Sequence, residues 1–130
     1  MTLKFHAAAI HIEETPEHVL LGLADDPSSP DDYVVLMRGR KGGSGVPGEV
    51  VDGVYLEYGG ETMAGHGCLA SVTLHPDRLV LRIDRKRCKL IPHAELVVTF
   101  DPAYETAHRL PGLLRQLIGD TAPLRILAGE

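Results

Sequence analysis

Short segments in which apolar and polar residues alternate recur along most of the chain, separated by glycine, proline and aspartate. The alternation is clearest in residues 79–83, where Leu79, Leu81 and Ile83 share one parity. Since successive side chains of a strand point to opposite faces, this pattern predicts a strand with one buried and one wetter face. The chain is therefore expected to be rich in β-strands.

Seven segments with strand character precede the C-terminal region. They cover residues 2–13, 18–24, 33–38, 54–58, 68–75, 79–83 and 94–100. In the first segment the apolar parity changes near Ala8 and Ala9, which predicts a bulge or a strand that bends from one sheet surface to another. The last three segments before residue 84 are expected to be consecutive antiparallel strands. The link over residues 74–79 is short, so the two strands that it joins should pair as a hairpin.

Helical spacing of apolar residues follows the last long strand segment, up to Ile118. Asp101 suits the N-cap position and Pro102 suits the first helical position. Pro111 interrupts the pattern and should kink the helix or divide it into two short helices. Gly119 should end it.

Residues 124–127 suggest a final short strand. Many strands followed by one amphipathic helix indicate an α+β fold. We expect a curved antiparallel sheet of about seven strands packed by a C-terminal amphipathic helix. The 130 residues match the size of one ordinary domain, so residues 1–130 are predicted to form a single domain.

Composition narrows the class of protein. The apolar fraction of 44% can build a core, and no apolar run approaches the length of a membrane helix. The N-terminal residues do not resemble a signal peptide, so a cytoplasmic chain is expected. In that compartment Cys68 and Cys88 are expected to be free thiols, with Cys68 a small buried hydrophobe within a strand.

Charge is distributed unevenly along the chain. Residues 1–65 carry eleven acidic and four basic side chains, a formal charge of −7, whereas residues 66–130 carry +2. An acidic half is compatible with a basic protein partner and argues against nucleic acid as the main ligand. The alternative is that the acidic residues only keep the protein soluble.

Candidate catalytic and cofactor-binding motifs are weak. The glycine-rich residues 39–48 lead into a strand rather than a helix, so they lack the geometry of a phosphate-binding loop. Five residues could supply nitrogen or sulfur ligands: His66, Cys68, His75, Cys88 and His93. Their spacing matches no familiar zinc pattern. Cys68 beside His66 is also a nucleophile–base pair on paper, although core packing is the favoured interpretation. No catalytic residue, cofactor or metal is therefore predicted.

Several strand segments carry a resemblance to a known family. The block from Gly53 to Tyr58, the glycines Gly65 and Gly67 before a strand, and the hairpin over residues 74–84 resemble the immunity protein 10 family of bacterial polymorphic toxin systems. Residues 21–26, 33–38 and 95–101 are similar to other strands of that family, and the resemblance covers residues 3–118. It implies a protein that binds and neutralises a cognate toxin and that is not an enzyme.

Electrostatic complementarity speeds the encounter of oppositely charged partners. We therefore expect an acidic loop and the turn after the central strand to contact the toxin. The predicted contact residues are Asp25, Asp26, Asp31, Asp32, Glu57, Tyr58, Glu61 and His66. The competing interpretation of Glu57 and Glu61 is an ordinary solvent-facing role.

Two other functions stay open. The chain could be a small metal-binding or enzymatic domain that uses His66, Cys68 and neighbouring histidines. It could also be a structural subunit that forms a homodimer, since open sheet edges invite pairing. The expected partner is otherwise a toxin domain, with no nucleic acid and no membrane.

Overall fold

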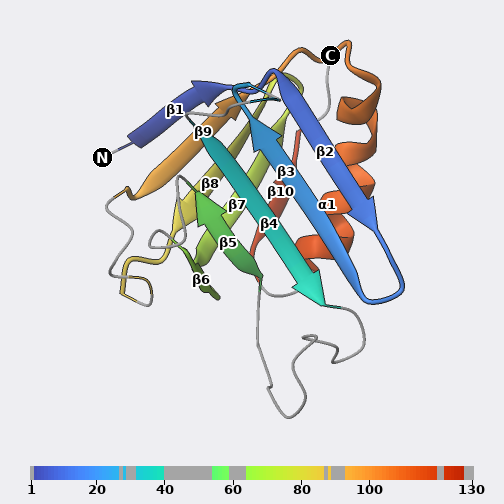
Figure 1. The fold of residues 1–130 in the computed structure, drawn as a ribbon. Coiled ribbons are helices and arrows are strands. Elements are labelled where there is room, and N and C mark those ends of the chain that lie inside the picture. The colour runs from blue at the N-terminus through green and yellow to red at the C-terminus, as the bar shows by residue number, and fades with distance from the viewer. Residues whose placement is uncertain are drawn as a thin grey trace.

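Two five-stranded sheets and one short helix make up the fold in the computed structural model (Figure 1). The structure describes residues 2–26, 28, 32–39, 54–58, 64–86, 88, 93–119 and 122–127, with residues 64–66 described by their backbone. In the following text, sheet A has the strand order β1-β9-β8-β7-β10 and sheet B has the order β2-β3-β4-β5-β6.

The strands lie close to the predicted segments. Sheet A consists of β1 (Thr2–His6), β7 (Leu69–His75), β8 (Arg78–Ile83), β9 (Glu95–Thr99) and β10 (Leu124–Ile126). Sheet B consists of β2 (Ala9–Glu14), β3 (His18–Ala24), β4 (Tyr33–Gly39), β5 (Tyr55–Tyr58) and β6 (Ala64–His66). The predicted β7–β8 hairpin is confirmed, because His75 pairs with Arg78 and Leu74 with Leu79 in an antiparallel register.

The chain passes directly from one sheet to the other at two corners. At the first, the amide of Ala7 donates to the Thr99 carbonyl in sheet A at 2.7 Å, and the next amide, of Ala8, donates to the Ala24 carbonyl in sheet B at 2.8 Å. The parity change near Ala8 and Ala9 thus marks a strand that bends between two sheet surfaces, one of its two predicted meanings. The second corner lies at Gly67, where φ is 67° and the amide donates to the Val54 carbonyl. A positive φ is cheap for glycine, so this residue suits a sharp change of direction.

One apolar core fills the space between the two sheets. Alternate residues of each strand point inward, among them Leu21, Leu36 and Leu56 from sheet B and Leu81 and Leu96 from sheet A, all with no exposed surface. Aliphatic side chains dominate this core because the chain has no Trp and only two Phe. The opposite face of each sheet therefore carries the residues of the other parity.

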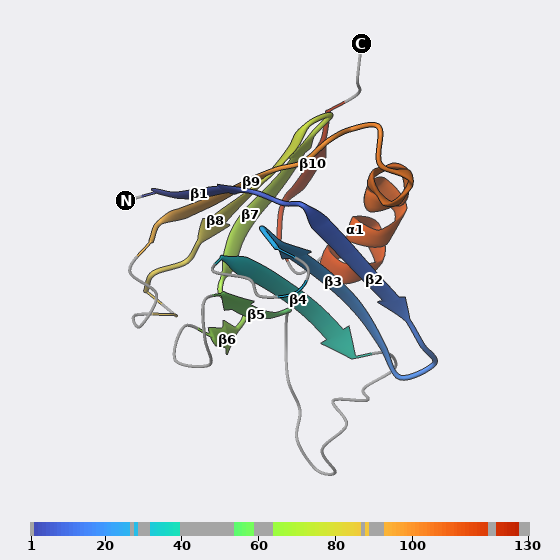
Figure 2. The same ribbon diagram turned by 45° about the horizontal axis from the view of Figure 1, so that its top comes forward.

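The helical region covers one side of the core between the two sheets. A 3₁₀-helix (Glu105–Arg109) leads into α1 (Leu110–Ile118), which packs against β3 and β4 of sheet B and β10 of sheet A (Figure 2). Pro111 lies in the first turn of α1, so the helical region is divided into two short helices, one of the two predicted outcomes. The N-cap prediction was wrong: Asp101 instead accepts a hydrogen bond from the Ala103 amide in a preceding turn.

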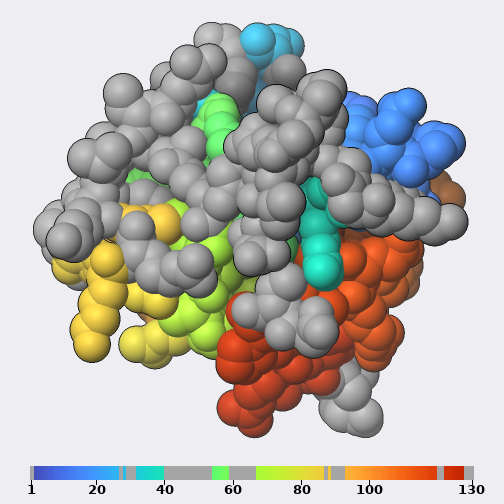
Figure 3. All heavy atoms as spheres, turned by 90° about the horizontal axis from the view of Figure 1, so that it is seen from below, coloured from blue at the N-terminus to red at the C-terminus, as the bar shows by residue number. Residues whose placement is uncertain are grey.

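Gly119 ends α1 where the helix meets β4. Its φ is 53°, and its amide donates to the Arg115 carbonyl at 3.1 Å. The Arg38 guanidinium reaches the carbonyls of Leu117 and Ile118, at 3.4 and 3.5 Å. Figure 3 shows the end of β4, in teal, against the orange and red C-terminal part of the chain. A cation at this position is favourable because the C-terminal end of a helix carries partial negative charge.

The single-sheet prediction needs correction. The α+β class fits a mostly β chain with one short helix, but the strands form two sheets rather than one curved sheet of about seven strands. The segments at β5 and β7 are not paired neighbours, because the chain changes sheets between them at Gly67. Two pairs, β1 with β9 and β10 with β7, are parallel. Parity along one strand cannot reveal which sheet a strand joins, since every strand with one buried face has the same pattern.

The prediction of free thiols was also wrong. Cys68 and Cys88 form a disulfide with their Cα atoms 5.6 Å apart. Cys68 lies just before β7, and its carbonyl accepts a hydrogen bond from the Asp84 amide after β8. The Cys88 amide in turn donates to the Asp84 carbonyl at 3.0 Å. The hairpin and the turn after it thus bring the two sulfurs together, which an argument from cellular compartment alone could not anticipate.

Candidate protein-binding surface

The outer face of sheet B carries a broad, partly apolar surface. Alternation along β2 to β5 and the strand registers place one parity of residues on this face. We call it the outer B surface: Ala9, His11, Glu13, Leu20, Gly22, Ala24, Tyr33, Val35, Met37, Tyr55 and Glu57. Apolar residues occupy its centre, while the two carboxylates lie on β2 and β5. It therefore has the composition of a protein contact site, apolar in the middle with polar groups around it.

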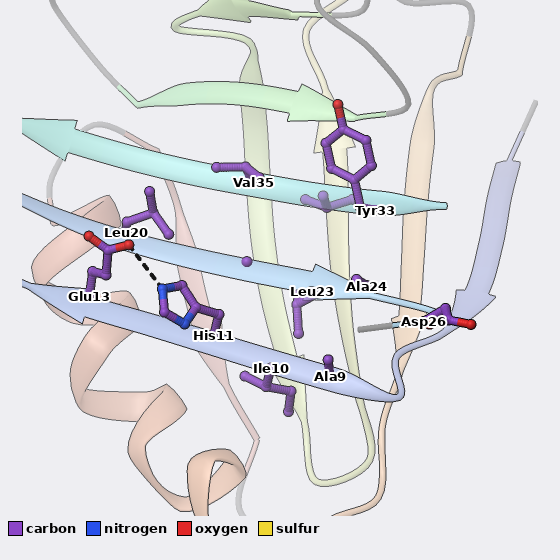
Figure 4. Close-up of a pocket in the computed structure, with 12 residues that line it drawn as sticks. Ala9, Ile10, His11, Glu13, Leu20, Leu23, Ala24, Asp26, Tyr33 and Val35 are labelled. Atoms are coloured by element: carbon purple, nitrogen blue, oxygen red, sulfur yellow. Dashed lines mark hydrogen bonds and ion pairs between the residues drawn. The ribbon is translucent and has the colours of Figure 1, made fainter. Parts of the chain in front are cut away.

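A shallow groove of about 630 Å³ runs over β2, β3 and β4 on this surface (Figure 4). Leu20, Ala24 and Val35 contribute to its apolar lining, and Asp26 lies at one end. Gly22 lies in the middle, and a Cβ placed there would come no nearer than 3.8 Å to its neighbours. Glycine is thus not required by space, and its lack of a side chain leaves the groove open between His11 and Val35.

Two tyrosines hold the carboxylate of Glu57 on β5. The Tyr33 hydroxyl donates to Oε2 at 2.7 Å, and the Tyr55 hydroxyl donates to Oε1 at 2.6 Å. Val35 on β4 pairs directly with Glu57 on β5, so Tyr33 reaches Glu57 from the diagonal position on β4. In Figure 4 the ring of Tyr33 extends toward β5. Diagonal neighbours on one sheet face are within reach of aromatic side chains. The carboxylate is thus fixed in place without a cationic partner among these two contacts.

Two histidines hold the carboxylate of Glu13 on β2. His11 Nε2 lies 2.9 Å from Oε2, and His18 Nε2 lies 3.4 Å from Oε1. The hydrogen bond with His11, followed by that with His18, lowers the pKa of the Glu13 carboxyl from its ordinary value. The Glu13 carboxylate on the outer B surface therefore stays ionised to a lower pH than an ordinary glutamate does.

The two sheets differ in charge. The strands of sheet B contain three acidic residues, Glu13, Glu14 and Glu57, and one Lys or Arg, namely Arg38. The strands of sheet A contain one acidic residue, Glu95, and four basic ones: Lys4, Arg78, Arg82 and Arg125. The acidic bias of the first half of the sequence therefore becomes an acidic bias of one sheet.

Comparison with protein families identifies the family of the chain. The model for the immunity protein 10 family matches residues 6–106. The chain belongs to the immunity protein 10 family. The match covers most of the region in which the strand segments showed the resemblance, and it includes β2 to β5 and hence the outer B surface. Among curated proteins, none matches the chain.

The structure separates the predicted contact residues of this immunity protein. Glu57 lies on the outer B surface, and Asp26 lines its groove. Asp25 and Asp32 close the base of the loop beside it, since the Asp25 amide donates to the Asp32 carbonyl at 3.0 Å. Tyr58 points the other way: it is buried, and its hydroxyl bonds to His93 Nδ1 at 2.7 Å.

The remaining predicted residues are less fully described. Asp31 and Glu61 lie outside the described residues, as does the glycine-rich segment after Gly39. His66 is described by its backbone alone, which pairs with Tyr55 across β5 and β6. In the described part of the chain, the acidic loop thus contributes Asp26 to the groove, and the central strand contributes Glu57 to the same face of sheet B.

Sequence reasoning missed most of the residues on this surface. His11, Glu13, Leu20, Tyr33 and Tyr55 were assigned to strands but not to a site. A signal was present for His11, Glu13 and Tyr55, because each shares the polar parity of its strand. Leu20 and Tyr33 gave no such signal, because both parities of their strands are mainly apolar. What the sequence did not show is that four strands place these residues on one continuous face.

Cys68 is unsuitable as a ligand or nucleophile in the alternative of a metal-binding or enzymatic domain. Cys68 is fully buried and bonded to Cys88, so neither sulfur is a thiolate that could act as a ligand or a nucleophile. Within the described part of the chain no three His, Cys, Asp or Glu side chains converge on a possible metal position. The same part contains no helix long and apolar enough to cross a bilayer.

Proposed function

We propose that this immunity protein neutralises a cognate toxin domain by binding it through the outer B surface, without catalysing a reaction. The observation that carries the proposal is the surface itself, which combines apolar residues such as Leu20 and Val35 with two carboxylates held by neighbouring side chains. Family membership supplies the class of partner. The interface would act by occupying a surface of the toxin.

Charge favours a basic partner. Sheet B carries the acidic bias of the molecule, and residues 1–65 have a formal charge of −7. Toxins that attack nucleic acid are usually basic, so the outer B surface would attract one and speed their encounter. Sheet A, with four basic residues among its strands, has the wrong sign for such a partner.

A matched pair of valines tests which sheet binds. Val35 lies on the outer B surface, and Val97 lies on the outer face of β9, an inner strand of sheet A; both are partly exposed. The probe is the toxin domain encoded next to this chain. We expect Val35→Lys to weaken binding at least tenfold in calorimetry and to abolish protection of cells, because it places a bulky charge in an apolar contact. Val97→Lys should bind like the unmodified chain.

The results separate the possibilities. Equal binding by both variants and the unmodified chain would remove the outer B surface from the proposal. Loss of binding in Val97→Lys alone would move the interface to sheet A. A homodimer stays a prediction: β2 and β6 end sheet B, β1 and β10 end sheet A, and sedimentation of the chain alone measures whether these edges pair.

A further inference from the structure

Glu57 differs from Glu13, the other carboxylate of the outer B surface, in the side chains that hold it. Both of its oxygens accept hydrogen bonds from tyrosine hydroxyls, at 2.7 and 2.6 Å, whereas Glu13 is held by two histidines. Tyrosine is neutral in the physiological range, so its hydroxyl orients the carboxylate without cancelling its charge. Histidine takes up a proton near neutral pH and then offsets the charge of its partner.

A carboxylate has room for further donors after two such contacts. Its two oxygens together offer about four lone-pair sites, and each tyrosine hydroxyl uses one. The free sites lie in the plane of the carboxylate, where a planar pair of N–H groups can approach in parallel. Within the described strands of sheet B, the single arginine is Arg38, which is directed to the carbonyls at the end of α1. No Lys or Arg side chain of the described strands of sheet B therefore competes for Glu57, and His11 is bonded to Glu13.

The two rings add a second element of recognition. Tyr33 comes from β4 and Tyr55 from β5, so Glu57 has an aromatic ring on two sides. A guanidinium group stacks on aromatic rings and is more weakly hydrated than an ammonium group, so it loses less on leaving water. An ammonium group can pair with the charge but cannot form the parallel two-bond contact.

We propose that Tyr33, Tyr55 and Glu57 form the seat of one arginine side chain of the bound toxin, and that this seat prefers arginine to lysine. The proposal rests on the proposed function, since it names the partner group that the outer B surface receives. Glu57 accepts two N–H groups of the guanidinium, and the tyrosines act as positioning residues for the carboxylate.

The first experiment needs no toxin. Methylguanidinium and methylammonium are titrated separately into the isotopically labelled full chain, up to about 100 mM, and NMR shifts are followed. We expect saturating shifts at Tyr33, Tyr55 and Glu57 with methylguanidinium, and weaker ones with methylammonium. The shifts should disappear in Glu57→Gln and persist in Glu95→Gln, which removes a carboxylate from the outer face of sheet A. Equal responses to the two cations, or no response at these residues, would overturn the proposal.

The second experiment uses the neighbouring toxin domain and calorimetry. Loss of the charge in Glu57→Gln should weaken binding about 30-fold or more, since removing one partner of an enclosed charge pair is costly. Tyr33→Phe combined with Tyr55→Phe keeps the charge and the rings, so a smaller loss of about threefold to tenfold is expected. Glu95→Gln should bind normally.

The two failures are distinguishable. If the unmodified chain does not bind the toxin domain, the proposed function fails, and the methylguanidinium titration still decides whether the seat exists. If the unmodified chain binds and Glu57→Gln binds equally well, the outer B surface remains the interface but Glu57 is not its arginine seat.

Discussion

Reduction of the Cys68–Cys88 disulfide should destabilise the protein by about 3 kcal/mol. The two cysteines are 20 residues apart in the sequence, and closing a loop of that length removes conformational entropy from the unfolded chain. The loop-closure relation gives about 11 cal/mol/K, which is about 3 kcal/mol at room temperature. For a domain of this size the loss corresponds to a decrease in Tm of about 10 °C.

Urea denaturation of the oxidised and reduced chain measures this difference. The oxidised form is prepared in a glutathione redox buffer, and mass spectrometry after alkylation counts the free thiols. A variant with both cysteines replaced by serine provides the control, because reductant should leave its unfolding curve unchanged. Two reactive thiols in the folded chain after oxidation, or the same unfolding free energy with and without reductant, would refute the reasoning.

Two further predictions concern stability and ionisation. Gly119→Ala should lower the free energy of unfolding in urea by about 2 kcal/mol, because the Gly119 backbone combines φ 53° with ψ −122°. Gly112→Ala, in open space within α1, should raise it by about 0.5–1 kcal/mol. Equal effects of the two substitutions would contradict the left-handed helix end at Gly119. The pKa of Glu13, followed by NMR of its carboxyl carbon, should lie below 4.5 and should rise in His11→Ala. A lowered folded-state pKa means that this contribution to stability is present above the unfolded value and is lost as the pH falls through the lowered one; a Glu13 pKa at or above 4.5 would refute it.

Local features of the fold could be predicted from the sequence because they depend on neighbouring residues. The parity change at Ala8, the hairpin at residues 74–79, the break at Pro111 and the helix end at Gly119 all follow from short-range geometry. The final strand β10 was also anticipated at residues 124–127, although its parallel pairing with β7 was not.

The division into two sheets could not be predicted in the same way. Each strand has one buried face, and that pattern is identical whether the strand belongs to sheet A or sheet B. The decisive feature is the corner at Gly67, which looks like an ordinary turn in the sequence. The disulfide depends on this long-range arrangement too, since it joins that corner to the turn after β8.

The site shows the same limit. The sequence predicts Glu57 and Asp26 as contact residues from charge; Glu57 lies on the outer B surface and Asp26 lines its groove, and their contact with a toxin stays a prediction. Tyr33 was not predicted, because its contact with Glu57 joins residues 24 positions apart and depends on the β4–β5 register. Tyr58 was grouped with Glu57 because they are adjacent in sequence, but adjacent residues of a strand point to opposite faces. Burial accordingly raises the pKa of the Tyr58 hydroxyl inside the core.

Methyl cross-saturation NMR on the complex with the neighbouring toxin domain measures directly whether the outer B surface is the interface. This measurement reports which methyl groups of the chain lie against the unlabelled partner. We expect strong attenuation at Leu20, Val35 and Met37 on the outer B surface and none at Val80 and Val97 on the outer face of sheet A. Attenuation at Val80 and Val97 with unaffected signals at Leu20, Val35 and Met37 would contradict this expectation.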